Sequence, residues 1–416
     1  MDRLAHVGHG VATRVATQVA IIGAGYAGMA AAVTLAERGV PVRVFESGPV
    51  PGGRARRVVS QGYKLDNGQH IFVGAYSELF RLMRTVGVSA NAVLRLPFEV
   101  RYANGFALRA GLAGLLLARG VPIAEKMQTV KFVAALRRAR FRVEPDITVK
   151  ELLDKHGQRG RMRHYLWAPL CVSALNTPLD QASANVFLAA LRDTIGIGGA
   201  SSDLLLPRVD LSALFPEPAA EFVRARGGEV RCGTTIRDLS GLKNEYESVI
   251  VAVGPHQLKN LLPDAANGYT YQPIYTCYLQ YPERTRLDFP VLGLGEGLVQ
   301  WAFDRGALLG EKGRLACVIS AQGDHQQMTH DELAERCDRE LRQAFPNLPA
   351  PLWNQVIAEK RATISCTPGL KRPDIRTATT GVFLAGDYTD PEYPPTLEAA
   401  VRSGIRAAGL VASSVT

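Results

Sequence analysis

Three glycines and one carboxylate near the start of the chain have the types and the spacing that bind a dinucleotide. Gly23, Gly25 and Gly28 follow the apolar run 19–22, and Glu46 ends a second apolar run. Gly23 permits a tight turn, Gly25 lets the backbone approach a pyrophosphate, and Gly28 lets a helix lie close to the preceding strand. Glu46 would accept hydrogen bonds from an adenosine ribose and repel a 2′-phosphate.

A strand, a helix and a second strand must position these residues. The sequence predicts buried strands over 19–22 and 42–46 with a helix between them. Tyr26 and Ala27 stand at the start of this helix, whose free amides and dipole would hold the pyrophosphate. The uncharged run 15–36 is long enough to cross a bilayer. Its three glycines and its change from a strand pattern to a helix pattern argue against a single membrane helix.

Composition places the chain among ordinary globular proteins. It has 416 residues, 47% of them hydrophobic, and a net charge of +9 from 48 basic and 39 acidic residues. No nucleic-acid-binding motif accompanies this charge, so an anionic membrane surface is a better candidate partner than a nucleic acid. The six cysteines are scattered, which predicts reduced thiols and no metal site. Residues 1–18 lack the apolar segment of a signal peptide, so we predict a cytoplasmic location.

A glycine pair followed by arginines comes directly after Glu46. The loop 47–57 contains Gly53 and Arg54. NAD enzymes have no general need for such a loop, but it resembles the Gly-Gly-Arg loop of flavoproteins in the amine oxidase and carotene desaturase superfamily. The resemblance implies FAD as the dinucleotide, with Arg54 close to its pyrophosphate and flavin. The alternative is a solvated basic turn.

The next loop is rich in groups that donate or accept protons. Asp66, Gly68, Gln69 and His70 lie within the segment 63–76. In the superfamily that the chain resembles, this segment crosses the face of the flavin ring, where only a flat backbone fits. The resemblance therefore places Gly68 and Gln69 against the ring and His70 beside it. The alternatives are a structural histidine and, for Asp66, a turn-capping carboxylate.

A second motif of glycine and carboxylate stands near the C-terminus. The run 381–390 predicts a buried strand that ends at Gly386 and Asp387. A helix follows a proline pair and begins near Thr396 and Leu397. By resemblance, Asp387 would hold the ribitol and pyrophosphate region of FAD. The helix N-terminus would direct positive potential at the N1–O2 edge of the flavin.

The chain as a whole resembles the hydroxysqualene dehydroxylase family. The resemblance rests on Asp66-Asn67-Gly68-Gln69-His70, Leu175-Asn176-Thr177-Pro178, Thr367-Pro368-Gly369-Leu370 and Gly386-Asp387-Tyr388-Thr389-Asp390. It extends from about residue 19 to the C-terminus. It implies non-covalent FAD, an apolar C30 isoprenoid substrate and an external electron donor. The implied reaction is reductive removal of the hydroxyl of hydroxysqualene to give squalene, in bacterial hopanoid biosynthesis.

Loss of a hydroxyl group as water requires an acid. Within the implied reaction, His70 and Asp66 are the leading candidates for this acid, and Glu392 and Tyr393 stand behind them. The alternative for Glu392 is a solvated loop carboxylate. Reduced FAD would supply the hydride.

The predicted fold is α/β, with a Rossmann-type FAD-binding domain and an interleaved α+β substrate domain, as in amine oxidases and phytoene desaturases. The predicted segments are 1–18 for an N-terminal extension, 19–93, 211–259 and 371–416 for the FAD-binding domain, and 94–210 and 260–370 for the substrate domain. By resemblance, the backbone of Val230 meets the adenine. The apolar stretch 167–206 predicts a substrate cavity or plain core.

A basic helix is predicted over 123–142 in the substrate domain. Ile123, Met127, Val130 and Ala134 form one side of it, and lysines and arginines crowd its far end. Such a helix can lie in a membrane interface with its apolar side down, which would make the protein peripheral on the inner face of the cytoplasmic membrane. The alternative is a core-facing helix with a solvated basic face.

Three other functions fit the same motifs. A phytoene-type desaturase would use oxidised FAD to withdraw hydride, an amine oxidase would consume oxygen, and a binding protein would retain FAD as a structural ligand. The polar loop around His70 favours the dehydroxylase. Only one glycine fingerprint with a downstream acid is present, so we expect a separate reductant rather than a second, NAD(P)H-binding domain.

Overall fold

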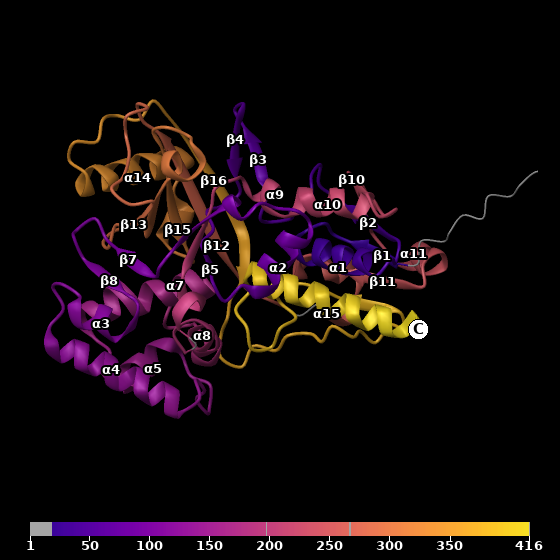
Figure 1. Cartoon of the computed structure of the whole chain (residues 1–416), viewed down its shortest axis with the longest axis horizontal. Coiled ribbons are helices and arrows are strands. Elements are labelled where there is room, and N and C mark those ends of the chain that lie inside the picture. The colour runs from indigo at the N-terminus through magenta and orange to yellow at the C-terminus, as the bar shows by residue number, and fades with distance from the viewer. Residues whose placement is uncertain (1–18, 197, 266–267, 416) are drawn as a thin grey trace, which may run out of the picture.

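Two five-stranded sheets organise the chain in the computed structural model, which describes residues 19–415 apart from 197, 266 and 267. A parallel sheet lies at one end of the long axis and an antiparallel sheet lies toward the other (Figure 1). The prediction of an α/β fold with a Rossmann-type part and a second, mixed part is confirmed. The predicted N-terminal extension lies outside the described residues.

The parallel sheet has the strand order β10-β2-β1-β11-β17. Its strands are β1 (Val19–Ile22), β2 (Val42–Glu46), β10 (Glu229–Cys232), β11 (Ser248–Val251) and β17 (Val382–Leu384). All four pairings are parallel, so the carboxyl ends of the strands share one edge. The glycine turn and Glu46 meet at this edge, where the amide of Gly23 donates to the carbonyl of Phe45 at 2.7 Å.

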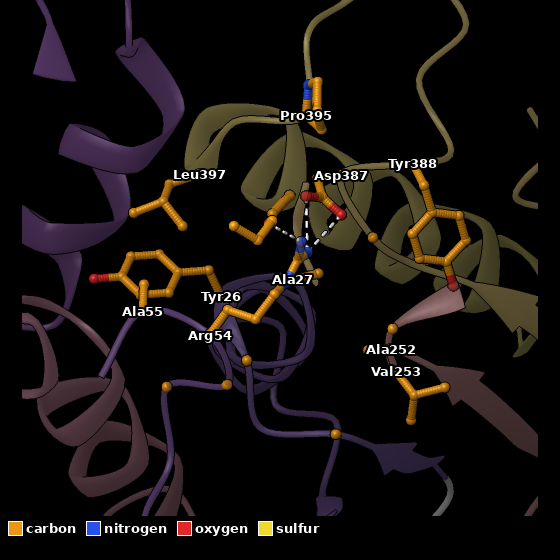
Figure 2. A pocket seen from close by; sticks show the side chains of 18 of the residues that line it. Tyr26, Ala27, Arg54, Ala55, Ala252, Val253, Asp387, Tyr388, Pro395 and Leu397 are labelled. Atoms are coloured by element: carbon orange, nitrogen blue, oxygen red, sulfur yellow. Dashed lines mark hydrogen bonds and ion pairs between the residues drawn. The ribbon is translucent and has the colours of Figure 1, made fainter. Parts of the chain in front are cut away.

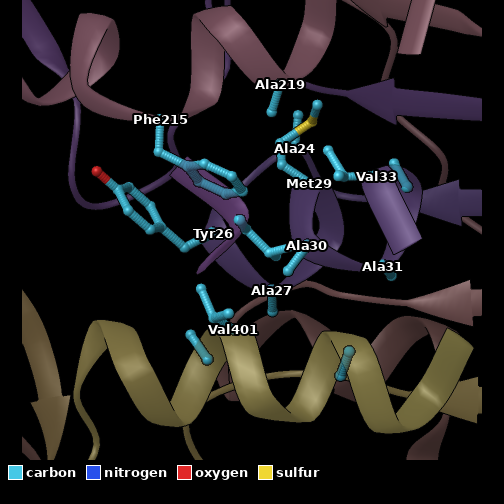
Figure 3. Packing of buried hydrophobic residues seen from close by; sticks show 14 of the residues in the cluster. Ala24, Tyr26, Ala27, Met29, Ala30, Ala31, Val33, Phe215, Ala219 and Val401 are labelled. Atoms are coloured by element: carbon cyan, nitrogen blue, oxygen red, sulfur yellow. The ribbon is translucent and has the colours of Figure 1, made fainter. Parts of the chain in front are cut away.

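Two helices from opposite ends of the chain pack against each other beside this sheet. The helix α1 (Tyr26–Glu37) is almost entirely buried, and α15 (Leu397–Val415) runs along it (Figure 3). Small residues make this possible, since a Cβ at Gly404 would lie 2.1 Å from the carbonyl oxygen of Ala27. The other side of α1 packs on α10 (Pro216–Arg224), where the rings of Tyr26 and Phe215 lie 5.4 Å apart.

The antiparallel sheet has the strand order β13-β14-β15-β12-β16. Its strands are β12 (Tyr271–Gln280), β13 (Val291–Gly293), β14 (Trp301–Asp304), β15 (Arg314–Ser320) and β16 (Trp353–Ile364). The helix α14 (His330–Ala344) packs on β12 and β16, and the short helix α13 (Arg305–Leu309) follows β14. Side chains of β12, β14 and β15, such as Tyr278 and Phe303, pack with Leu65 and Leu206 and so join the sheet to the first half of the chain.

A group of helices completes the second part. Its members are α3 (Gly111–Leu117), α4 (Ile123–Arg138), α5 (Val149–Lys155), α6 (Gly160–Met162), α7 (Ala168–Leu175) and α8 (Ala184–Leu191). The predicted helix 123–142 ends earlier, at Arg138, because Arg140 and Phe141 have φ angles of 52° and 55° that a helix cannot contain. None of the helices in the described ranges is both long enough and apolar enough to cross a bilayer.

Short elements connect these layers. They are β3 (Arg57–Ser60), β4 (Tyr63–Asp66), β5 (Phe72–Val73), β6 (Val93–Leu96), β7 (Glu99–Arg101), β8 (Ala107–Arg109), β9 (Leu204–Pro207), α2 (Ser77–Thr85), α9 (Leu211–Leu214), α11 (Ser240–Glu245) and α12 (Pro255–Leu261). The parallel sheet draws its strands from all three segments predicted for the FAD-binding domain. The domain boundaries themselves stay predictions.

Candidate active site

A cavity of about 820 Å³ lies along the carboxyl edge of the parallel sheet. All the residues predicted to bind the cofactor line it except Gly28 and Val230. The lining ones are Gly23, Gly25, Tyr26, Ala27, Glu46, Gly53, Arg54, Gly68, Gln69, His70, Gly386, Asp387, Thr396 and Leu397. The fold thus brings motifs from both ends of the sequence into one elongated cavity.

The two exceptions have different physical reasons. A Cβ at Gly28 would lie 1.9 Å from the carbonyl oxygen of Gly23, so Gly28 serves the close packing of helix against turn. Val230 lies within β10, pairs with Val44 and is buried in the core. Near the end of that strand the cavity is lined by Thr234 and Ile236 rather than by Val230, and contact of Val230 with the adenine stays a prediction.

Arg54 and Asp387 join the two halves of the cavity (Figure 2). Both carboxylate oxygens of Asp387 accept from one guanidinium nitrogen of Arg54 at 2.8 Å, and another nitrogen donates to the carbonyl of Ala362 in β16. Arg54 therefore connects the Gly-Gly-Arg loop both to Asp387 at the end of β17 and to the antiparallel sheet. A fixed cation at this position suits an anionic ligand.

Some polar atoms in the wall of the cavity are free to bind a dinucleotide. The Nδ1 atom of His70 and the hydroxyl of Tyr388 are buried and have no hydrogen-bond partner in the described part of the chain, and both residues line the cavity. A buried polar atom without a partner is costly, so a bound polar ligand would stabilise both. The carboxylate of Glu46 is already oriented, because the amides of Ala24 and Gly48 each donate to it at 2.7 Å. These features fit FAD.

A second, apolar cavity of about 250 Å³ opens beside the first. Its walls come mainly from α7, α8 and the antiparallel sheet, and include Leu166, Leu170, Phe187, Leu191, Trp301, Phe303 and Val318. The two cavities share part of their lining. The shared residues are Gln69, Ile71, Tyr76, Ser173, Ala174, Ile274 and Thr396. The polar groups of Gln69, Tyr76, Ser173 and Thr396 thus gather where an apolar chamber meets the larger cavity.

Asp66 lies outside both cavities, in a buried ion pair. Its carboxylate lines neither cavity and accepts from the amide of Leu211 and from the guanidinium of Arg305, each at 2.9 Å. Burial raises the pKa of Asp66, and the charge of Arg305 opposes this rise. In this structure Asp66 is a buried anchor, and its role as the acid stays a prediction. Glu392 is exposed and lines neither cavity, so its role also stays a prediction.

His70 and Tyr393 do reach the cavities. His70 lines the larger cavity, and burial lowers the pKa of its imidazole to about 4. Tyr393 lines the apolar cavity, and burial raises the pKa of its hydroxyl above the usual range. Both are therefore neutral at pH 7, and Tyr393 keeps its proton as a hydrogen-bond donor.

Low pH is expected to destabilise the cofactor-free protein, because His70 is buried in its neutral form. The His70 imidazole has a pKa of 6.5 in the unfolded chain and of about 4 in the folded protein. Between these pH values the unfolded state binds more protons, so the free energy of unfolding decreases as the pH is lowered. A His70→Gln variant should lose about 2 kcal/mol less than the wild type between pH 7 and pH 5, as measured by urea unfolding. An equal loss in both proteins would contradict this assignment. Replacement of the exposed His330 with glutamine serves as the matched control.

A buried hydrogen-bond network beside the segment 63–76 was not foreseen from the sequence. The hydroxyl of Tyr278 donates to the carbonyl of Asp66 at 2.7 Å and accepts from the side chain of Gln69 at 2.9 Å. Arg305 donates to both Asp66 and Gln69. Nothing in the local pattern of β12 or α13 marks Tyr278 or Arg305, because their partners lie more than 200 residues away in the chain. Across the described residues, no group of histidine, cysteine or carboxylate side chains is arranged to hold a metal.

Comparisons with known proteins agree with this geometry. Residues 26–412 match the family described as flavin containing amine oxidoreductase. The chain is 30% identical to a hydroxysqualene dehydroxylase of Sinorhizobium fredii, over 95% of this chain and 98% of that protein. It is 23% identical to a zeta-carotene desaturase of Solanum lycopersicum, over 95% and 80%.

The fold is also that of a solved amine oxidase. Cyclohexylamine oxidase from Brevibacterium oxydans superimposes with a TM-score of 0.70 and 18% identity, over 96% of this chain and 99% of that one. The resemblance predicted from the motifs is confirmed. The chain belongs to the family of flavin-containing amine oxidoreductases.

Proposed function

We propose that this protein reductively removes the hydroxyl of hydroxysqualene to give squalene, with FAD bound non-covalently in the larger cavity. The observation that carries the proposal is the junction of the two cavities, where polar groups meet the end of an apolar chamber. An isoprenoid alcohol has the matching shape of an apolar chain with one polar group. The hydroxysqualene dehydroxylases at 30% identity support the same substrate.

The reaction replaces a hydroxide on carbon by a hydride, and the hydroxide leaves with one proton as water. Reduced FAD supplies the hydride when bound, and an external electron donor must reduce it again. The apolar walls exclude water and hold the isoprenoid chain. The amide of Gln69 and the hydroxyls of Tyr76, Ser173 and Thr396 can orient the substrate hydroxyl at the junction. His70 is the candidate source of the proton.

An anaerobic single turnover tests the proposal. Purified enzyme is reduced chemically and mixed with hydroxysqualene while flavin absorbance is followed and the lipid product is analysed. Flavin reoxidation with an equal amount of squalene is the expected result. A silent reduced flavin, together with bleaching of the oxidised enzyme by a polyene, would replace the dehydroxylase with a carotene desaturase.

Replacement of His70 with alanine is expected to slow this single turnover by about 10²- to 10⁴-fold, the usual contribution of a general acid. With a pKa of about 4, only about one imidazole in a thousand carries the proton at pH 7. The wild-type rate should therefore rise as pH falls toward 4, and the variant should lose this dependence. His330→Ala, which changes an exposed histidine outside both cavities, is the control and should keep the wild-type rate and pH dependence. An unchanged rate in His70→Ala would remove His70 from the reaction.

A further inference from the structure

Large apolar side chains are exposed together at one place on the surface. Leu112, Leu116 and Leu117 of α3 and Ile123 and Met127 of α4 expose between 46% and 79% of their surface. We call these five side chains the α3–α4 patch. In the rest of the described chain only Val59, Tyr63 and Leu352 are large apolar residues of comparable exposure.

The α3–α4 patch belongs to well-anchored helices. The inner sides of the two helices bury Leu115, Phe132 and Leu136 in the core of the helical group. The side chain of Lys126 in α4 donates to the carbonyl of Leu116 in α3 at 2.6 Å, which ties the two helices together. Figure 1 shows α3 and α4 at the end of the molecule opposite the parallel sheet. The exposed leucines therefore cannot be attributed to loose packing of these helices.

Positive charge surrounds the α3–α4 patch. The range 109–142 contains eight arginines and lysines and a single acidic residue, Glu125. This carboxylate already accepts from the amide of Met162 at 2.9 Å. Six cations of this range are exposed and form no ion pair with any described residue: Arg119, Lys131, Arg137, Arg138, Arg140 and Arg142. An apolar patch with a basic border is complementary to an anionic lipid surface.

One face of α4 carries apolar side chains in its first half and basic side chains in its second half. Ile123 and Met127 form its first half, and Lys131, Ala134 and Arg138 continue the same face at helical spacing. Val130, predicted for this face, is half-buried instead. Apolar side chains at one end can enter the acyl region while the cations at the other end meet phosphate groups.

We propose that the α3–α4 patch docks this protein on an anionic lipid bilayer. The docking is a binding event and is measurable whether or not hydroxysqualene is the substrate. Together with the proposed function, it would hold the apolar cavity next to the phase in which isoprenoids dissolve.

Co-sedimentation of the FAD-loaded protein with lipid vesicles tests the docking. We expect binding to vesicles that contain phosphatidylglycerol, weak binding to pure phosphatidylcholine, and loss of binding in high salt. A double variant, Leu117→Ser with Ile123→Ser, should bind at least about 10-fold more weakly. A variant with Arg137→Gln and Arg138→Gln should lose the preference for phosphatidylglycerol.

The matched control replaces two equally exposed apolar residues elsewhere, Val59 and Leu352, with serine and should bind as the wild type does. Flavin content and thermal unfolding confirm that each variant is folded. Equal vesicle binding by the Leu117→Ser, Ile123→Ser variant and by the wild type would overturn the proposal. A dimer in sedimentation velocity that this variant dissociates, without any binding to vesicles, would assign the patch to a second copy of the chain instead.

Discussion

A Gly25→Ala variant is expected to bind FAD about 100-fold more weakly, an effect of about 3 kcal/mol, while its cofactor-free form keeps wild-type stability. Gly25 precedes α1 with a φ of −70°, which alanine adopts freely. A Cβ there would meet only the Cα of Gly53, at 3.8 Å. The added methyl group therefore occupies cavity space that the pyrophosphate needs. Titration with FAD, followed by flavin fluorescence, measures the affinity, and urea unfolding measures the stability.

Two other glycines supply the controls. A Cβ at Gly28 would collide with the carbonyl of Gly23, so Gly28→Ala should destabilise even the cofactor-free protein. A Cβ at Gly241 in α11 would meet nothing within 4 Å, so Gly241→Ala should leave the affinity for FAD unchanged and should not lower stability. If Gly25→Ala bound FAD as tightly as the wild type, the glycine turn would not lie at the pyrophosphate.

An Arg305→Met variant is expected to lose about 3–5 kcal/mol of stability, because it leaves buried carboxylates without their cation. Arg305 is 1% exposed and donates to Asp66 at 2.9 Å and to Glu311 at 2.7 and 2.8 Å. Glu311 keeps a second partner in Arg314, but Asp66 keeps no other cation among the residues that the structure describes. Urea unfolding of the cofactor-free protein measures the loss. The absorbance spectrum of bound flavin should also shift, since the loop that Asp66 anchors lines the cavity.

A surface ion pair provides the comparison. Lys150 contacts Asp154 at 3.2 Å on an exposed face, and Lys150→Met should cost no more than about 1 kcal/mol. Adding Asp66→Asn to Arg305→Met should recover part of the stability, because a neutral amide needs no counter-charge. Equal losses in Arg305→Met and Lys150→Met would show that the buried guanidinium stabilises the fold no more than a surface pair does.

Local sequence motifs predicted most of the cofactor cavity because each motif determines the conformation of its own segment. The glycine turn, Glu46 and Asp387 follow strands of the parallel sheet, and parallel strands bring such residues to one edge. Val230 does not line the cavity because β10 continues for two more residues, a length on which the resemblance carried no information. The helix at 123–142 failed at its end, where two residues with positive φ interrupt an otherwise helical pattern.

Long-range contacts determine the surroundings of Asp66, Glu392 and the polar junction, and no local sequence pattern predicts these contacts. Asp66 looks like a catalytic carboxylate until Arg305 is placed beside it, 239 residues further along the chain. Ser173 joins the junction because α7 lies beside β14, where Trp301 donates to Ser173 at 3.2 Å. Long-range packing therefore decides which of several polar residues meets a ligand.

The interleaved order of the parallel sheet has a consequence for synthesis of the chain on the ribosome. β1 emerges first but acquires its neighbour β11 only after some two hundred further residues, and β17 and α15 arrive at the very end. The Arg54–Asp387 pair and the packing of Gly404 on α1 are likewise completed only then. The nascent protein thus spends most of its translation without a closed dinucleotide cavity. We therefore expect cofactor capture only after β17 has been synthesised.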